Sequence, residues 1–108
     1  MKSRVVFRNA SSSRLGRVTM AGSNFNGRGA APFRTFGQYA LVYLRDGSWR
    51  YQDTNGRSQP IHPGDTIIVF PELPHGYGPG PGEHWSEFYV CFDGPVFDLW
   101  QECGLLDP

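Results

Sequence analysis

The stretch IHPGDTIIVFP, residues 61–71, decides the fold of this chain. Pro63 sets one backbone dihedral of a tight turn, Gly64 can adopt a backbone conformation that other residues resist, and the Asp65 carboxylate can accept hydrogen bonds from the turn backbone. A short apolar run follows the turn directly and ends at a proline, which cannot donate a backbone hydrogen bond to a sheet. The stretch therefore predicts a tight turn that leads into one short β-strand, Thr66–Phe70.

Similar short segments, bounded by turn residues, lie on both sides of this stretch. The near-continuous apolar run from 39 to 45 predicts a strand buried on both faces. The turn signals at residues 46–47 (DG) and 54–56 (TNG) predict two β-hairpins. Residues 23–31 and the GPGPG segment at 78–82 are expected to be irregular loops. We expect further strands at Leu15–Ala21, Tyr39–Arg45, Ser48–Asp53, Arg57–His62 and Trp85–Phe92.

One segment near the end of the chain has the period of an α-helix. Pro95 suits the first helical position, with Asp93 or Gly94 as its cap, and Gly104 suits the position just after the helix. Short strands followed by a single short helix predict an all-β fold, an antiparallel β-barrel with one helix packed on it. The apolar stripe expected to face the barrel consists of Val96, Leu99, Trp100 and Cys103.

The size and composition fit one small, turn-rich domain. The chain has 108 residues, with 14 Gly and 9 Pro. We expect an N-terminal arm at residues 1–16, the barrel at 17–94, and the helix with a truncated end at 95–108. Cys91 and Cys103 are expected to be reduced apolar fillers. No apolar run is long enough for a signal peptide or a bilayer span, which predicts a cytoplasmic protein with no membrane partner.

The charges are distributed unevenly, although the net charge is zero. The first acidic residue is Asp46, and all but two of the 10 Lys and Arg residues precede it. A basic arm of this kind can contact DNA phosphate, or it can lie against the acidic barrel or simply be solvated. The basic residues are not dense and no basic helix is evident, which favours the second interpretation.

Several of these segments resemble a known family. Residues 61–71, together with PHGY at 74–77, resemble the second half of a cupin motif, and residues 44–51 resemble the end of its first half. From residue 34 to the end, the chain is similar to the N-terminal effector-binding, arabinose-binding-like domain of AraC-type transcription regulators. This resemblance implies a cupin-type antiparallel β-barrel, or jelly-roll, that binds a small molecule and forms a homodimer. It is carried by WSEF at 85–88 and FDGP at 92–95.

The sequence departs from the family pattern where metal-dependent cupins hold their ion. If Gly47 is the last glycine of the first half-motif, Ala40 stands where those proteins have Glu. Only His75 lies near a ligand position, and one histidine does not make a metal site. We therefore expect no metal, no cofactor and no catalytic residue. The positions of the paired histidines hold Arg34 and Phe36, or alternatively Phe33 and Thr35.

The expected ligand site combines one strand with the loop before it. Alternation along residues 85–92 puts Trp85, Glu87, Tyr89 and Cys91 on one face, and leaves a plain core face of Ser86, Phe88, Val90 and Phe92. Prolines at 71 and 74 stiffen a loop that brings two more ring side chains to the barrel mouth. Rings can cover the C–H face of a sugar while charged groups bind its hydroxyls. The predicted ligand-binding residues are Arg34, His75, Tyr77, Trp85, Glu87 and Tyr89.

The resemblance implies that Tyr77, Glu87 and Tyr89 hold the ligand, although the sugar-binding relatives do not have an acid at the position of Glu87. Each assignment has a structural alternative. His75 can be a loop residue satisfied by backbone, Glu87 can face solvent or pair with an arginine, and Arg34 can be a surface residue. The two other histidines, at 62 and 84, are expected to be exposed.

The sequence favours the sensor part of a transcription regulator, with a sugar or similar small polar effector. DNA would be bound only through a helix-turn-helix domain that this chain lacks. Self-association is expected through Phe97 together with Leu105 or Leu106. One alternative is a free-standing, metal-free cupin enzyme acting on a sugar, such as an isomerase or a lyase. Another is a ligand-free barrel that only dimerises.

Overall fold

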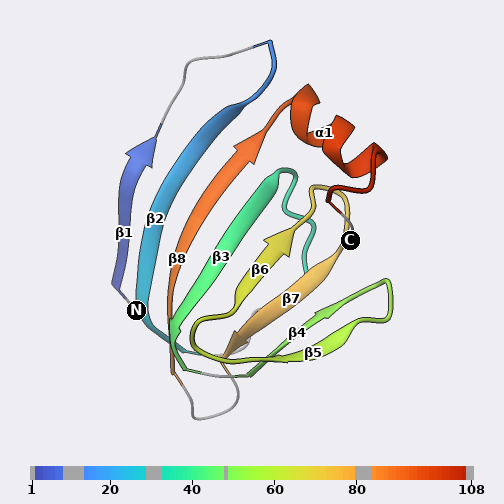
Figure 1. Ribbon diagram of the computed structural model, residues 1–108. Helices are drawn as coiled ribbons and strands as arrows, with labels where there is room; N and C mark the ends of the chain where they lie inside the picture. The colour runs from blue at the N-terminus through green and yellow to red at the C-terminus, as the bar shows by residue number, and fades with distance from the viewer. Residues whose placement is uncertain (1, 9–13, 29–32, 48, 80–83, 107–108) are drawn as a thin grey trace.

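Two antiparallel β-sheets face each other in the computed structural model, which describes residues 2–8, 14–28, 33–47, 49–79 and 84–106 (Figure 1). Five strands, in the spatial order β1-β2-β8-β3-β6, form the larger sheet, and three, in the order β5-β4-β7, form the smaller one. This arrangement, with one short helix α1 after the last strand, confirms the all-β class. The elements are β1 (Lys2–Arg8), β2 (Arg17–Arg28), β3 (Tyr39–Asp46), β4 (Trp49–Asp53), β5 (Ser58–Ile61), β6 (Thr66–Val69), β7 (His75–Pro79), β8 (His84–Asp93) and α1 (Pro95–Glu102).

The hydrophobic core lies between the two sheets. On β3, the alternate side chains of Ala40, Val42 and Leu44 point inward, because successive residues of a strand face opposite sides of the sheet. Burying one such aliphatic side chain contributes about 1.5–3 kcal/mol, so this cluster is what holds the sheets together. Its other buried members are Tyr51, Ile61, Ile67, Val69, Trp85 and Cys91.

The turn at residues 62–65 has the predicted geometry. The backbone N–H of His62 donates a hydrogen bond to the Asp65 carboxylate at 2.8 Å, and the backbone N–H of Asp65 donates one to the His62 carbonyl at 3.0 Å. Gly64 has a φ of 95°, a conformation that glycine adopts without steric cost. The turn thereby carries the chain from β5 in the smaller sheet to β6 in the larger one.

The hairpin expected at residues 46–47 is wrong. β3 pairs with β6 and β8, whereas β4 pairs with β5 and β7, so the chain crosses between the sheets here. A Cβ atom at Gly47 would lie 2.3 Å from the carbonyl oxygen of His84, so only glycine lets the crossing pass this close to β8. The hairpin predicted at 54–56 is confirmed, because β4 and β5 are antiparallel neighbours.

Two segments expected to be irregular are partly strand. β2 continues through residues 23–28 and pairs with both β1 and β8, and residues 78–79 complete β7. Pairing with neighbouring strands outweighs the weak strand preference of glycine. Pro79 is tolerated because β7 is an edge strand of the smaller sheet. Residues 29–31 and 80–82 of the expected loops lie outside the described residues. Residues 2–8 of the expected arm form β1.

Helix α1 begins and ends as predicted but packs through a different face. The ring of Phe97, expected to lie off the contact stripe, packs against Phe92 with 4.6 Å between ring centroids and against Tyr39 at 6.0 Å. Leu99 and Trp100 are instead 53% and 41% exposed. The helix has 8 residues, too few for the sequence periodicity to single out one face. Within the described residues, no helix has the length and apolarity needed to cross a membrane.

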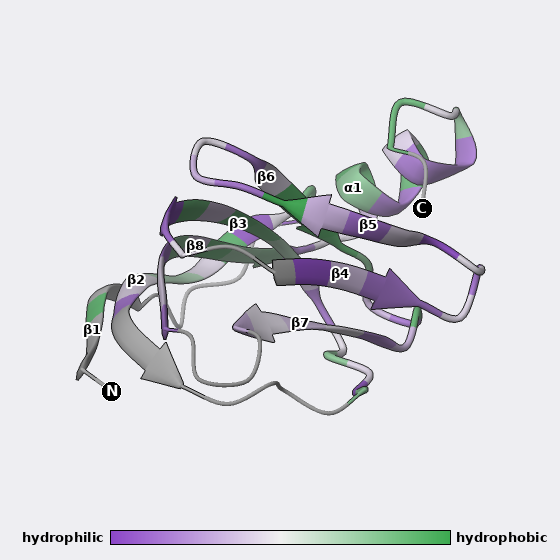
Figure 2. Cartoon of the chain, turned by 90° about the horizontal axis from the view of Figure 1, so that it is seen from below, coloured by the Kyte–Doolittle hydropathy of each residue, from purple (hydrophilic) through white to green (hydrophobic). Residues whose placement is uncertain are grey.

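The outer face of the larger sheet is only partly covered. Leu41 and Tyr43 of β3 are 39% and 45% exposed, and Phe88 of β8 is 46% exposed. Residues 39–45 were expected to be buried on both faces, and Phe88 was expected to belong to a core face of β8. Both expectations are wrong at these positions. The physical reason is that α1 covers this face only near Tyr39 and Phe92, close to the end of β8 where the helix begins. Figure 2 shows that β4 and β5 are mostly hydrophilic, whereas hydrophobic stretches recur along β3 and β6.

Candidate ligand-binding site

Two strands bring the predicted ligand-binding residues together between the sheets. His75 is buried on β7, and Trp85 and Glu87 are buried on β8. Tyr77 and Tyr89, from the same two strands, are partly buried and pack against the core cluster. The alternation predicted for residues 85–91 is therefore confirmed, since the face of β8 that carries Trp85 and Glu87 is the inner one.

Aromatic rings form a column that spans the interior from β4 to β8. The ring centroids of Tyr51 and His75 lie 6.2 Å apart with an interplanar angle of 18°, and those of His75 and Tyr77 lie 5.8 Å apart at 10°. Trp85 continues the column at 6.1 Å from Tyr77. Tyr51 was not among the predicted residues. The signal that could have found it is the alternation on 48–53, which gives Tyr51 the inner face of β4.

His75 presents a buried nitrogen without a partner. Its Nδ1 lies 3.1 Å from the carbonyl oxygen of Leu73, whereas its Nε2 has no hydrogen-bond partner among the described residues. Burial lowers the pKa of His75, so the ring is neutral near pH 7. Because the Leu73 carbonyl can only accept, Nδ1 carries the proton and Nε2 is a hydrogen-bond acceptor. The alternative that His75 is satisfied by backbone accounts for one of its two nitrogens.

Glu87 is held by two donors inside the barrel. The indole Nε1 of Trp85 donates a hydrogen bond to Glu87 Oε1 at 2.8 Å, and the side chain of Asn24 donates another. Burial raises the pKa of Glu87 above its usual value, while the two hydrogen bonds act in the opposite direction. The alternative that Glu87 faces solvent is wrong, since the residue is buried. Asn24 was missed because residues 23–31 were expected to be a loop.

Arg34 closes the edge of the smaller sheet beside β7. Its backbone N–H donates to the His75 carbonyl at 2.9 Å, and its carbonyl accepts from the His75 N–H at 3.0 Å. The guanidinium carbon lies 5.4 Å from the centroid of the Phe36 ring, and the guanidinium also donates a hydrogen bond to the Tyr77 hydroxyl. Arg34 itself is exposed. Arg34 therefore lies at the surface beside His75 and Tyr77, two members of the ring column.

The other two histidines lie apart from this site. His62 and His84 are exposed, as expected, and their nearest acids are Asp65 and Asp46 respectively. Among the described residues, no group of three or more His, Cys, Asp or Glu side chains is arranged to hold a metal ion.

Two cavities open near the ends of the smaller sheet, and neither is lined by the six predicted residues. One, of about 170 Å³, lies between β5 and β6 and reaches Tyr51. The other, of about 470 Å³, lies between α1 and the turn after β6. His75 is 1% exposed, so a ligand reaches Nε2 only if neighbouring side chains move.

Comparison with known proteins places this architecture in a family. The family described as the AraC-like ligand binding domain matches residues 21–108. The comparison with curated protein sequences found no match.

Several solved structures share the fold at low sequence identity. The cupin domain of Cnp3 from Schizosaccharomyces pombe superposes with a TM-score of 0.66 and 12% identity, covering 97% of this chain and 72% of that one. A Cupin 2 conserved barrel domain protein from Salinispora arenicola CNS-205 gives a TM-score of 0.64 and 14% identity, covering 94% and 83%. The polyketide cyclase RemF from Streptomyces resistomycificus gives 0.59 and 20%, covering 82% and 62%. The chain has the cupin β-barrel fold and belongs to the AraC-like ligand-binding domain family.

Proposed function

We propose that this domain senses a small neutral polyol, such as a sugar, bound between the two sheets. The observation that carries the proposal is the buried, unpartnered Nε2 of His75. A buried acceptor without a donor costs about 1–3 kcal/mol, and a ligand hydroxyl would remove that cost. The proposed contacts are Arg34, His75, Tyr77, Trp85, Glu87 and Tyr89, with Tyr51 added from the ring column.

The chemistry of these groups suits a hydroxylated ligand. His75 Nε2 accepts a hydrogen bond, the Glu87 carboxylate can accept another, and the guanidinium of Arg34 donates at the rim. Aromatic rings can lie against the C–H face of a sugar ring. His75 Nε2 and the Glu87 carboxylate are both buried acceptors, so they favour a ligand with hydrogen-bond donors. A polyol has hydroxyl donors, whereas an ionised carboxylate has none. In this proposal the ligand enters past the exposed Arg34 side chain.

The family match supports a regulatory role for the ligand. In this proposal the domain works in the cytoplasm, occupancy of the barrel is the signal, and DNA is bound only by a separate helix-turn-helix domain. The boundaries proposed for the barrel, 17–94, and for the helix with the residues after it, 95–108, place both the ligand and α1 in the sensing unit. The domain is proposed to act as a homodimer.

The alternative function is a metal-free cupin enzyme acting on a sugar, an isomerase or a lyase. It is kept because the solved structures that share the fold include a polyketide cyclase. The two functions differ in what happens to the ligand. A sensor returns the sugar unchanged, whereas an isomerase or lyase gives a product that proton NMR of the sugar detects during incubation with the protein.

The ligand proposal is tested with a panel of monosaccharides and the substitution His75→Phe. Phenylalanine keeps a ring in the column but removes Nε2, so we expect a sugar that raises the melting temperature of the wild type to bind about tenfold or more weakly. Isothermal titration calorimetry measures the change. His62→Phe is the matched control, because His62 is exposed. The proposal is wrong if no monosaccharide binds, or if His75→Phe binds a sugar as tightly as His62→Phe does.

A further inference from the structure

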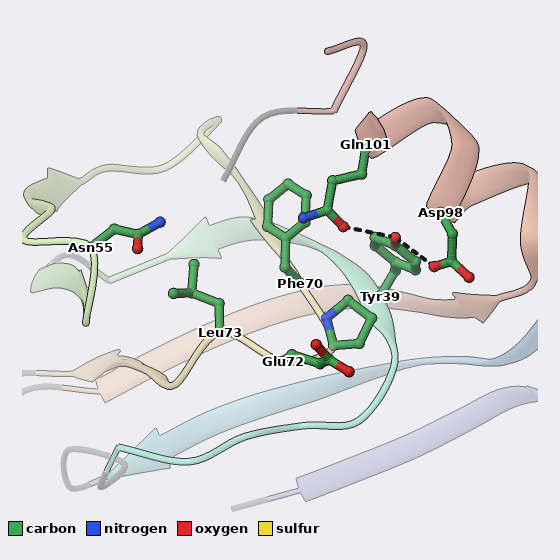
Figure 3. A pocket seen from close by; sticks show the side chains of 8 residues that line it. Tyr39, Asn55, Phe70, Glu72, Leu73, Asp98 and Gln101 are labelled. Atoms are coloured by element: carbon green, nitrogen blue, oxygen red, sulfur yellow. Dashed lines mark hydrogen bonds between the residues drawn. The ribbon is translucent and has the colours of Figure 1, made fainter. Parts of the chain in front are cut away.

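A second, separate groove lies between α1 and the barrel. Figure 3 shows its lining, which comes from the start of β3, the turn after β6, the β4–β5 turn and one face of α1. Its volume is about 470 Å³, enough for a small molecule. None of the residues proposed to contact the polyol lines this groove. The lining residues are Tyr39, Asn55, Phe70, Pro71, Glu72, Leu73, Asp98 and Gln101.

The apolar part of the groove is rigid. Tyr39 and Phe70 are almost fully buried, and their rings meet edge to face at 5.9 Å between centroids. Tyr39 is also stacked on Phe92 at 5.5 Å with an interplanar angle of 8°. Pro71 and Leu73 continue this apolar surface along one side. The rings of Tyr39 and Phe70 form the fixed floor of the groove, and the partly buried Pro71 and Leu73 offer accessible apolar surface to a hydrocarbon group.

The polar part of the groove combines two carboxylates, of Glu72 and Asp98, with one hydroxyl and two amides. The Tyr39 hydroxyl lies 2.9 Å from Asp98 Oδ1 and 3.1 Å from Gln101 Oε1, yet it carries a single proton. One of these two oxygens therefore receives no hydrogen from Tyr39. If the Gln101 amide is turned by 180°, its nitrogen donates to Tyr39, and its oxygen then turns away from that hydroxyl. In that orientation Tyr39 donates to Asp98 and accepts from Gln101, and the exposed Asp98 carboxylate keeps further acceptor positions toward the groove.

The groove is also negatively charged. The carboxylates of Asp98 and Glu72 both lie on its wall (Figure 3). Burial raises the pKa of Tyr39 to about 12, and the hydrogen bond to Asp98 and the charges of Asp98 and Glu72 add to that rise. The field of both carboxylates thus reaches one hydroxyl. Among the described residues, the ion pairs involve other carboxylates, those of Asp46, Asp65 and Asp93.

We propose that this groove binds a small organic cation, in which an ammonium or guanidinium group lies between Asp98 and Glu72 and an apolar body lies against Pro71 and Leu73, over the edges of the buried rings. A cationic head supplies charge-assisted hydrogen-bond donors to the two carboxylates and the positive charge that the lining residues lack. The apolar body packs against Pro71 and Leu73. Because Asp98 and Gln101 belong to α1 and the other lining residues belong to the barrel, the bound cation ties the helix to the barrel. This makes the groove a second ligand site, distinct from the polyol site.

The test titrates the protein with 2-phenylethylammonium and, separately, with the neutral isostere 2-phenylethanol, while NMR follows the backbone amides of Asp98 and Gln101. We expect the ammonium ion to bind and to shift these signals, and the alcohol to bind at least about tenfold more weakly. Asp98→Asn and Glu72→Gln should each weaken ammonium binding by about tenfold. Glu102→Gln should not, because Glu102 is exposed on the same helix and does not line the groove.

A second set of measurements distinguishes binding at this groove from binding at the polyol site. His75→Phe should leave ammonium binding unchanged, and Asp98→Asn should leave sugar binding unchanged. Butylguanidinium in place of the ammonium ion should bind the same residues. Circular dichroism confirms that each variant is folded before it is titrated. The proposal is overturned if neither cation shifts the groove signals, if the alcohol binds as tightly as the ammonium ion, or if Asp98→Asn and Glu72→Gln bind it like the wild type.

Discussion

At the scale of single residues, the buried polar side chains of Asp53 and His75 differ in how completely they are hydrogen-bonded. Asp53 accepts hydrogen bonds from the Tyr51 hydroxyl at 2.8 Å and from the backbone N–H groups of Asn55 and Arg57 at 2.9 and 3.2 Å. It therefore fixes both the β4–β5 turn and one end of the ring column. His75 differs, because one of its nitrogens is satisfied and the other is not. A buried polar group with all its hydrogen bonds made stabilises the fold, whereas one with an unpartnered atom costs stability.

The neutral state of His75 predicts how stability changes with pH. Burial lowers the pKa of His75 below the value of 6.5 that it has when unfolded. Between the two pKa values the unfolded chain binds more protons, so the free energy of unfolding falls as the pH drops below about 6.5. We expect the wild type to lose stability from pH 7 to pH 5 relative to His75→Phe.

Urea denaturation at each pH measures this difference. Glu87, whose pKa is raised by burial, acts with the opposite sign above its unfolded value of 4.5, but it is present in both proteins and cancels. His62→Phe should follow the wild type, since His62 is exposed. Parallel stability curves for the wild type and His75→Phe would show that His75 is not held neutral by the fold.

At the scale of elements, Phe97 provides the main ring contact between α1 and the barrel. Phe97 meets Phe92, Tyr39 and Trp100, whereas Leu99 on the same helix is 53% exposed. The helix has no side-chain hydrogen bond at its N-cap. The barrel contact, more than the helix's own ends, therefore keeps α1 in place.

Replacement of Phe97 by Ala should cost about 2–4 kcal/mol of unfolding free energy, because it removes a packed ring from the interface of α1 and the barrel. Leu99→Ala should change stability by less than about 1 kcal/mol. Thermal and urea unfolding measure both. Similar losses for the two variants would mean that α1 is held through the predicted stripe rather than through Phe97.

At the scale of the whole molecule, exposed apolar side chains remain on the outer surface. They include Leu99, Trp100 and Leu105 around α1, and Leu41, Tyr43 and Phe88 on the larger sheet. The sequence prediction that Phe97 or Leu106 would meet a partner is wrong, because both pack against the barrel. Leu105, the other residue predicted for this contact, is 74% exposed.

Self-association is accordingly predicted through the exposed side chains around α1. The wild type should show a concentration-dependent dimer in sedimentation velocity, and Leu105→Asp should weaken it by about tenfold or more by placing an unpaired charge in the contact. Thr54→Asp, which adds a charge at the exposed β4–β5 turn, should not. A wild type that stays monomeric at high concentration contradicts the prediction.

The sequence by itself determined the parts of the molecule that depend on neighbours along the chain. The turn at 62–65, the inward face of Trp85 and Glu87, and the ends of α1 follow from local backbone chemistry and from the two-residue period of a strand. The inner-face residues of the candidate site were predictable for the same reason.

Only the tertiary structure decided what depends on pairing between distant segments. The hairpin signal at Gly47 is the same whether the next strand joins the same sheet or the opposite one, and the pairing of β4 with β5 and β7 decides for the opposite sheet. Asn24 and the groove beneath α1 belong to their sites because segments far apart in the sequence meet there, and nothing in either local sequence indicates that meeting. For Tyr51, alternation indicates the inner face of β4, but only the pairing of β4 with β7 puts its ring beside His75. An eight-residue helix can likewise pack through more than one face. Here the face that carries Phe97 packs against Phe92 of the barrel.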